Sequence, residues 1–190
     1  SEIAARRGLG LAILPASDDP VATILDTEIG ELTFQSYFVQ HHHSVTTQSI
    51  RYEGAATARP SDAALTALRT AERIIIAPSN PVLSIEPILA IPGFRDILVA
   101  RRDHVTAISP FVGGSALKGP ADRLMNELGF GASNVGIAKY YADYVSTLVI
   151  DEVDSADARE VEATGVAVRV TTTVMADPGH ADQLVRTVLA

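Results

Sequence analysis

The chain has 190 residues, of which 47% are hydrophobic and 20% are charged, and it contains no cysteine. Its length suits one ordinary domain, or one and a part, and the missing cysteines exclude disulfides, thiolate metal sites and a cysteine nucleophile. A formal net charge of −8 disfavours nucleic acid as a partner, and no apolar run is long enough to span a membrane, so we expect a cytoplasmic protein.

The first part of the chain, residues 1–59, has the pattern of short strands. Residues 1–10 carry no initiator methionine and resemble the end of a helix, so we expect the sequence to be a piece of a longer protein. The apolar and alternating stretches that follow predict strands over 11–16, 21–27 and 31–40, with a hairpin turn at 28–31. We expect these strands to form a small inserted strand-rich region.

The second part, residues 60–190, alternates strands with helices. Such alternation is typical of βαβ units, and near-continuous apolar strands are typical of a parallel sheet that is covered on both faces. We therefore predict an α/β fold, a Rossmann-like core with a doubly wound parallel sheet. The predicted strands are 73–77, 104–109, 146–150 and 166–171, and the predicted helices are 61–71, 81–90, 93–101, 119–128, 134–144, 154–164 and 178–189.

A polar turn follows the first core strand, in the stretch "IIIAPSNPVLSIEPILAIPG". Ligands of open α/β sheets bind at the carboxyl ends of the strands, and a helix N-terminus there favours an anion. Ser79, Asn80 and Ser84 add side-chain donors at this turn. An alternative needs no ligand, because Ser79 or Asn80 as N-cap with Pro81 at the first helical position is an ordinary helix start.

A glycine-rich turn follows the second core strand. Gly113 and Gly114 would let a backbone approach a phosphate closely, and Lys118 offers a positive charge four residues later. The stretch is no P-loop, because the G-x-x-x-x-G-K-[ST] pattern is absent. A glycine-rich turn with a solvated lysine explains the same residues. Two such turns after strands of one sheet nevertheless favour a phosphate-binding edge, with Ser79 and Gly113 at neighbouring strand ends.

Three further groups of polar residues are weaker candidates. Asp18 and Asp19 could hold Mg²⁺, bind a sugar or act as a base, although adjacent aspartates before a proline are more often a turn. In the stretch 41–43 only the first and third histidines would share a strand face, and a solvated strand end accounts for them without a metal. Residues 136–141 give one helix a cationic and aromatic patch, which surface packing explains equally well.

Six stretches, in order and at matching spacings, resemble the CofD family. Those enzymes, called FbiA in actinobacteria, are the 2-phospho-L-lactate or phosphoenolpyruvate transferases of deazaflavin-coenzyme (factor-420) biosynthesis. The family's amino-terminal third, with its glycine-rich loop, has no counterpart here, so the resemblance implies that catalytic groups lie outside this sequence. The stretches are "PASDDPVATILDTEIGELTFQSYFV", "IIIAPSNPVLSIEPILAIPGFRDIL", "SPFVGGSALKGPADRLMNELG", "GIAKYYAD", "LVIDEVD" and "VTTTVMAD".

The resemblance implies a transfer without a covalent enzyme intermediate. The ribityl hydroxyl of the deazaflavin Fo attacks a phosphorus of a guanosine-diphosphate-activated three-carbon acid, and GMP leaves. It further implies Mg²⁺, with its ligands in the absent segment, and a homodimer. Such chemistry needs positioning and charge neutralisation more than a nucleophilic side chain. Phospholactate, phosphoenolpyruvate and phosphoglycerate differ by one or two atoms, and the sequence does not select among them.

The same resemblance assigns roles to residues of this chain. It implies phosphate or carboxylate contacts at the first turn, a diphosphate path at the second, a substrate-adjacent aspartate pair and an aromatic flank for the flat deazaflavin. Three positions depart from the family pattern: Ser115 replaces a lysine, Glu86 a glycine and Tyr140 a histidine. The implied site residues are Ser79, Asn80, Ser84, Gly113, Gly114, Lys118, Asp18 and Asp19, with Tyr37 and Phe38 as the flank.

Two other functions fit the same core. YvcK-like regulatory proteins are remote relatives that bind sugar nucleotides without known turnover, and a nucleotide-binding domain that merely pairs with another subunit is a third possibility. The inserted strand region with its aromatic residues favours the transferase, because a second, flat substrate needs a seat of its own.

Overall fold

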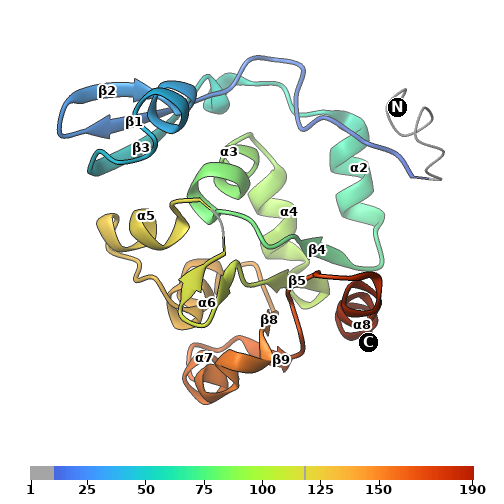
Figure 1. Ribbon diagram of the computed structural model, residues 1–190. Helices are drawn as coiled ribbons and strands as arrows, with labels where there is room; N and C mark the ends of the chain where they lie inside the picture. Colours follow the sequence, from blue (N-terminus) through green and yellow to red (C-terminus); the bar gives the residue numbers. More distant parts are fainter. Residues whose placement is uncertain (1–10, 118) are drawn as a thin grey trace.

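Four parallel strands form the central sheet of the computed structural model, which describes residues 11–117 and 119–190 (Figure 1). The strands lie in the order β4-β5-β8-β9, so each is hydrogen-bonded to the next one along the chain within this core. This arrangement confirms the predicted parallel sheet. Its strands are β4 (Ile74–Ile76), β5 (Val105–Ile108), β8 (Thr147–Ile150) and β9 (Ala167–Val170).

Helices connect these strands and cover both faces of the sheet, which confirms the predicted α/β fold with a parallel sheet. Ile108 and Val149 pack against Leu184 and Val188 of the last helix, whereas the other helices contribute to the larger core on the opposite face. The helices are α2 (Asp62–Thr70), α3 (Glu86–Leu89), α4 (Phe94–Ala100), α5 (Ala121–Glu127), α6 (Asn134–Tyr141), α7 (Ala158–Glu162) and α8 (Pro178–Leu189).

Short helical turns precede three of these elements. The predicted helix 81–90 begins as the wider π-helical turn η3 (Pro81–Ile85) before α3. Pro87 explains the irregularity, because its nitrogen has no hydrogen to donate to the carbonyl four residues earlier. The single turn η4 (Arg102–His104) leads into β5, and the longer, kinked η5 (Glu152–Asp157) leads into α7.

The inserted region is an antiparallel sheet of three strands in the order β2-β1-β3. These strands are β1 (Ala22–Thr27), β2 (Gly30–Thr33) and β3 (Thr47–Glu53), and the short turn η2 (Ala55–Thr57) follows them. The pairing of Thr27 with Gly30 confirms the predicted hairpin turn. The sequence did not predict β3, because polar residues interrupt its alternation. The division of the chain into the regions 1–59 and 60–190 as domains stays a prediction.

The predicted strand 31–40 is wrong beyond Thr33. The chain turns into a helix there and continues as the π-helical turn η1 (Ser36–Gln40). The Thr33 hydroxyl accepts a hydrogen bond from the Ser36 N–H at 3.2 Å, as at a helix start. Helical spacing also brings the rings of Phe34 and Phe38 together, with centroids 5.6 Å apart, and buries Tyr37. The packing of these aromatic side chains thus favours a helical turn over the strand that the alternating sequence predicted.

Two further strand predictions are also wrong. Residues 11–16 run without a strand partner in the described part of the chain, and the bridge between Ser17 and Pro60 follows directly after them. The predicted strand end at 41–43 is a turn, in which His42 and His43 have left-handed φ angles of 48° and 45°.

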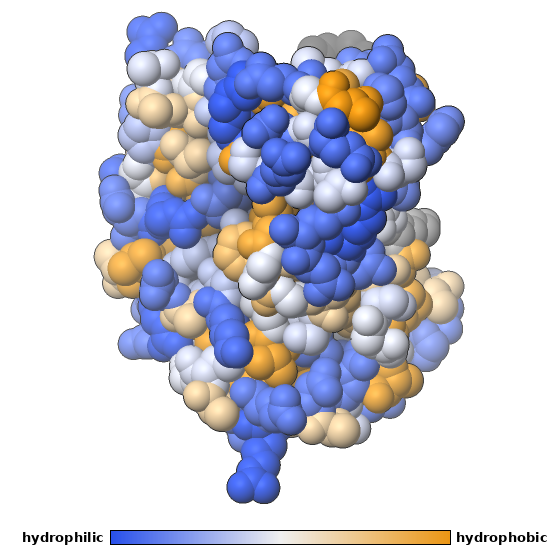
Figure 2. Space-filling view, turned by 90° about the vertical axis from the view of Figure 1, so that its left-hand side faces the viewer, coloured by the Kyte–Doolittle hydropathy of each residue, from blue (hydrophilic) through white to orange (hydrophobic). Residues whose placement is uncertain are grey.

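Hydrophobic side chains on the surface are scattered in separate patches on the face that Figure 2 shows. Isolated exposed apolar residues are normal for a folded chain. Among the described residues, no helix combines the length and the apolar character needed to cross a bilayer.

Helix α6 approaches the preceding turn so closely that only glycine fits at position 136. A Cβ atom there would lie 2.1 Å from the carbonyl oxygen of Gly131 and 2.7 Å from that of Phe130. Because both neighbours are backbone atoms, we expect Gly136→Ala to destabilise the protein by about 2 kcal/mol and to lower Tm by about 4–8 °C. Gly179→Ala is the matched control, since its closest neighbour is a side-chain oxygen at 3.2 Å. Equal melting temperatures for both variants would contradict the close contact between position 136 and the carbonyls of Phe130 and Gly131.

Candidate active site

A cavity of about 570 Å³ lies at the carboxyl ends of β4, β5 and β9, and we call it the strand-end cavity. This is the position at which open α/β sheets bind ligands. None of its described lining residues is charged. The lining consists of Phe34, Phe38, Pro78, Ser79, Asn80, Leu83, Ser84, Ser109, Pro110, Val112, Leu117, Gly119, Pro120, Ala121, Thr173, Val174 and Met175.

The polar turn after β4 forms one wall of this cavity. Ser79, Asn80 and Ser84 line it together, as the sequence predicted for the first strand end. Asn80 is also the N-cap, because its side-chain oxygen accepts hydrogen bonds from the N–H groups of Val82 and Leu83, both at 3.0 Å. Its amide nitrogen has no partner among the described residues. Asn80 therefore combines the two alternatives, a helix cap and a candidate donor to a ligand.

A pair of phenylalanines forms a second, aromatic wall. Phe34 and Phe38 are each 40% exposed and both line the cavity. Tyr37, the other predicted flanking residue, is fully buried beneath the turn, so it cannot contact a ligand directly. Burial raises the pKa of the Tyr37 hydroxyl, which therefore stays protonated at neutral pH. The sequence did not single out Phe34, because a strand would not have placed it as a neighbour of Phe38.

A buried hydrogen-bond chain holds the floor of the cavity. The Ser109 hydroxyl donates to the side-chain oxygen of Asn134 at 2.6 Å and accepts from the N–H of Phe111 at 3.1 Å. The Asn134 amide in turn donates to Asp157 at 3.0 Å. Because its polar groups are paired, this chain fixes the end of β5 relative to α6.

Asp151, at the end of β8, holds the segment after β9. One carboxylate oxygen accepts hydrogen bonds from the N–H and the hydroxyl of Thr173, at 2.7 and 2.9 Å, and the other accepts from the N–H of Val153. Burial alone would raise the pKa of Asp151, but the hydrogen bonds from Thr173 and Val153 hold it below its ordinary value. Asp151 was not among the predicted site residues, although its position directly after an apolar strand is a signal that the sequence contains.

The glycine pair after β5 forms the tip of a small hairpin rather than a wall of the cavity. The hairpin joins β6 (Phe111–Val112) to β7 (Ser115–Ala116). Gly113 and Gly114 have φ angles of 63° and 78°, as a two-residue hairpin turn requires. The Gly113 N–H donates to Asp154 at 2.9 Å. Lys118 lies outside the described residues, and the diphosphate role of these three residues stays a prediction.

The predicted aspartate pair lies away from the strand-end cavity and does not line it. Asp19 accepts a hydrogen bond from the N–H of Arg59 at 2.7 Å, and this bond lowers the pKa of its carboxyl group. The Ser17 hydroxyl donates to the carbonyl of Arg59 at 2.7 Å. Asp19 thus belongs to a turn that ties residues 17–19 to residues 59–60, while Asp18 is exposed. A role of this pair at the substrate stays a prediction.

Glu86, which departs from the family pattern, points into a different cavity of about 380 Å³. Its carboxylate pairs with Arg95 and accepts a hydrogen bond from the Tyr140 hydroxyl at 3.0 Å. Burial raises the pKa of Tyr140, so this hydroxyl stays protonated and donates. Glu86 is thereby neutralised behind the polar turn instead of facing a ligand in the strand-end cavity.

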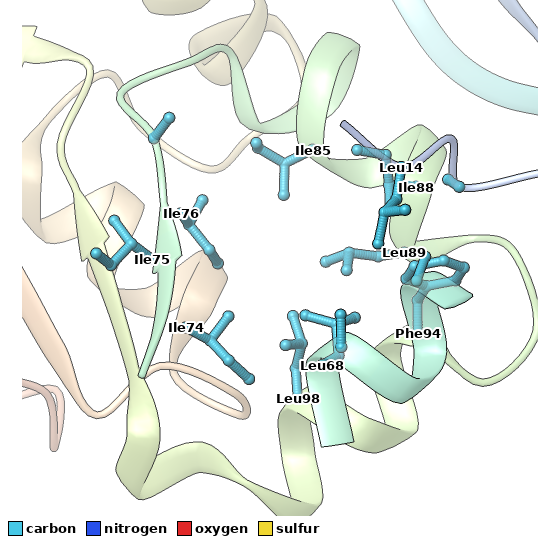
Figure 3. A pocket seen from close by; sticks show the side chains of 14 residues that line it. Leu14, Leu68, Ile74, Ile75, Ile76, Ile85, Ile88, Leu89, Phe94 and Leu98 are labelled. Atoms are coloured by element: carbon cyan, nitrogen blue, oxygen red, sulfur yellow. The ribbon is translucent and has the colours of Figure 1, made fainter. Parts of the chain in front are cut away.

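A third cavity, of about 360 Å³, lies between β4, α2, α3 and α4 and is lined only by apolar residues (Figure 3). In Figure 3, Ile74 and Ile76 point from the strand toward Leu68, Leu89 and Leu98. A substrate that carries phosphate and carboxylate groups would find no polar partner there. This cavity is therefore excluded as the phosphate site.

A metal site is not assembled by the described residues. No group of three or more histidine, aspartate or glutamate side chains in this part of the chain lies close enough to hold an ion. The Mg²⁺ that the resemblance implies, with its ligands in the absent segment, stays a prediction.

Comparisons with known proteins identify the family of this chain. The family model described as 2-phospho-L-lactate transferase CofD matches residues 1–188. The chain is 38% identical over 168 residues to the 2-phospho-L-lactate transferase of Methanococcoides burtonii, covering 88% of this chain and 54% of that protein. It is 36% identical over 186 residues to the phosphoenolpyruvate transferase of Kitasatospora aureofaciens, covering 95% and 58%.

A solved structure supports the fold. The crystal structure of a UPF0052-family protein from Bacillus halodurans superimposes with a TM-score of 0.69 at 17% identity, and the match covers all of this chain and 65% of that one. The chain spans little more than half the length of the curated relatives it matches. The match over residues 1–188 and the identities above show that this chain belongs to the CofD family, described as 2-phospho-L-lactate transferase.

Proposed function

We propose that the full-length protein transfers a phosphorylated three-carbon acid from its guanosine-diphosphate-activated form to the ribityl hydroxyl of Fo in factor-420 biosynthesis. The observation that carries this proposal is the composition of the strand-end cavity. One wall offers the Phe34–Phe38 pair, and the other offers the side-chain donors of Ser79, Asn80 and Ser84. A flat ring and an oxygen-rich group are the two chemistries that these walls would bind.

The proposed reaction is a substitution at phosphorus. The ribityl hydroxyl oxygen forms a bond to the phosphorus that carries the acid, while the anhydride bond to GMP breaks and its electron pair leaves with GMP. The hydroxyl proton passes to a base or to water. In this scheme the cavity residues position the two substrates, and no side chain of the described residues forms a covalent bond with them.

Neutral donors would provide most of the described contacts to phosphate. The hydroxyls of Ser79 and Ser84 and the amide of Asn80 are dipoles that stabilise developing charge without carrying charge themselves. No described carboxylate lines the cavity, so none repels a diphosphate there.

The test is a transfer assay with the full-length gene product, Fo and each activated acid, with products identified by mass spectrometry. We expect a product in which one phosphate joins the acid to Fo, together with one equivalent of GMP. Parallel reactions with the phospholactate, phosphoenolpyruvate and phosphoglycerate donors identify the acid. Tight binding of a sugar nucleotide without any turnover would instead support the YvcK-like alternative.

Lys118 provides a further test of the phosphate contacts. Its chain neighbours Leu117 and Gly119 line the strand-end cavity. A charge-assisted contact contributes roughly 1.5–3 kcal/mol, so we expect Lys118→Ala to lower kcat/KM by about ten- to a hundredfold at an unchanged Tm. Steady-state kinetics and thermal melting of this variant make the comparison. A wild-type rate would leave phosphate binding to the neutral donors alone.

A further inference from the structure

The aromatic wall of the strand-end cavity rests on a turn whose backbone conformation is unfavourable. His42 and His43 both adopt left-handed φ angles, which residues other than glycine rarely adopt. The His43 ring lies 5.4 Å from the ring of Phe38, and the His43 N–H donates to the carbonyl of Tyr37 at 2.9 Å. The position of Phe38 therefore depends on this turn keeping its shape.

Arg123, on α5, holds the turn in place. Its guanidinium donates to the backbone carbonyl of His43 at 2.5 Å and to that of Val45, and it forms an ion pair with Glu127. Glu127 accepts a hydrogen bond from the N–H of Thr47 at 2.9 Å with its other oxygen. One ion pair thus satisfies three backbone groups of residues 43–47, and charged groups make the stronger hydrogen bonds.

The start of the same helix also lines the cavity. Pro120 and Ala121, where α5 begins, line the strand-end cavity together with Leu117 and Gly119. Arg123 therefore joins α5 to residues 43–45, the turn that follows the aromatic wall formed by residues 34–38.

We propose that Arg123, with Glu127, is the positioning residue that adapts the cavity to a flat aromatic acceptor, an inference that rests on the proposed function. Neither side chain lines the cavity, so neither contacts a ligand there. Loss of the guanidinium releases the strained turn and displaces Phe38, whereas the wall formed by Ser79 and Asn80 stays in place. Acceptor binding is therefore affected selectively, and nucleotide binding is not.

The test compares two ligands with variants of the full-length protein. Fo binding is followed by its fluorescence anisotropy, and GMP binding by calorimetry. We expect Arg123→Ala to weaken Fo binding at least tenfold and to change GMP binding less than twofold, with partial recovery in Arg123→Lys. Arg51→Ala is the control, because Arg51 forms an exposed ion pair with Glu31 on the same strand-rich region. We expect it to change neither affinity.

Each outcome has a distinct meaning. Wild-type protein that does not bind Fo overturns the proposed function and this inference with it. Wild-type protein that binds Fo no more tightly than a folded Arg123→Ala variant overturns the inference alone, as does an equal loss for both ligands. If Arg123→Ala does not fold, Glu127→Gln retains an acceptor for Thr47 and is expected to weaken Fo binding alone; unchanged Fo binding in that variant also overturns the inference.

Discussion

Replacement of Asn80 by aspartate should lower kcat/KM at least a hundredfold while the protein keeps its stability. Aspartate is as good an N-cap as asparagine, so the hydrogen bonds from Val82 and Leu83 are retained. The substitution exchanges an amide donor for a negative charge on a wall that we propose to bind phosphate. Loss of the donor and charge repulsion both act on the bound diphosphate, which explains the large expected effect.

Asn80→Ala separates the cap from the contact to the ligand. This variant loses the cap, so we expect a stability loss of about 1 kcal/mol and a roughly tenfold lower kcat/KM. Thermal melting and steady-state kinetics of both variants distinguish the two roles. If Asn80→Asp were as active as the wild type, Asn80 would be a helix cap and nothing more.

Replacement of Asp151 by alanine should destabilise the protein by about 3 kcal/mol. The change leaves the N–H and hydroxyl of the buried Thr173 and the N–H of Val153 without their acceptor. For a chain of this size, such a loss lowers Tm by about 6–12 °C. Thr173 also lines the strand-end cavity, so activity should fall even at temperatures at which the variant is folded.

The control for Asp151 is the next residue, Glu152, which is exposed. Glu152→Ala should leave Tm within about 1–2 °C of the wild type, because a solvated carboxylate contributes little. The difference between the two variants isolates the buried hydrogen bonds from the change in net charge. A melting temperature of Asp151→Ala close to that of Glu152→Ala would contradict this account of the strand ends.

Asp151 also predicts a dependence of stability on pH. Its pKa is lower in the folded state than its ordinary value of 3.8, so the ionised form is favoured by folding. The contribution to stability is therefore present above about pH 4 and is lost as the pH falls through the lowered folded-state pKa. The Tm difference between wild type and Asp151→Ala should accordingly shrink below pH 4, as thermal melts across this range would show.

The core fold was predictable from the sequence because its signals are local and agree with one another. Continuous apolar strands such as 73–77 and 146–150 alternate with helices that carry ordinary start signals, and the structure places both in the expected sheet. The polar turn at Ser79 and Asn80 followed from the same rule, because carboxyl ends of parallel strands share one edge.

The helical conformation of the aromatic wall was not predictable, because the sequence pattern and the packing of its side chains favour different structures. Residues 34–40 alternate like a strand, yet the burial of Tyr37 and the contact between Phe34 and Phe38 favour a helical turn. The glycine pair illustrates a second limit. Positive φ angles suit a phosphate loop and a hairpin tip equally well, and only the pairing of β6 with β7 distinguishes them.

The buried contacts of Asp151 and Arg123 depend on residues far apart in the sequence. Asp151, after β8, accepts hydrogen bonds from Thr173, after β9. Arg123, on the helix that begins at Ala121, donates hydrogen bonds to backbone carbonyls of residues 43–45. No local pattern encodes such pairs. Acidic and basic side chains of this kind look like ordinary surface charges until the fold is known.

The most direct test of the central claim is a crystal structure of the full-length protein with Fo and GMP bound. Our account predicts the deazaflavin ring against Phe34 and Phe38, and phosphate oxygens within hydrogen-bond distance of Ser79, Asn80 or Ser84. Ligand density in the cavity beside Glu86 and Arg95, with the strand-end cavity filled only by solvent, would contradict it.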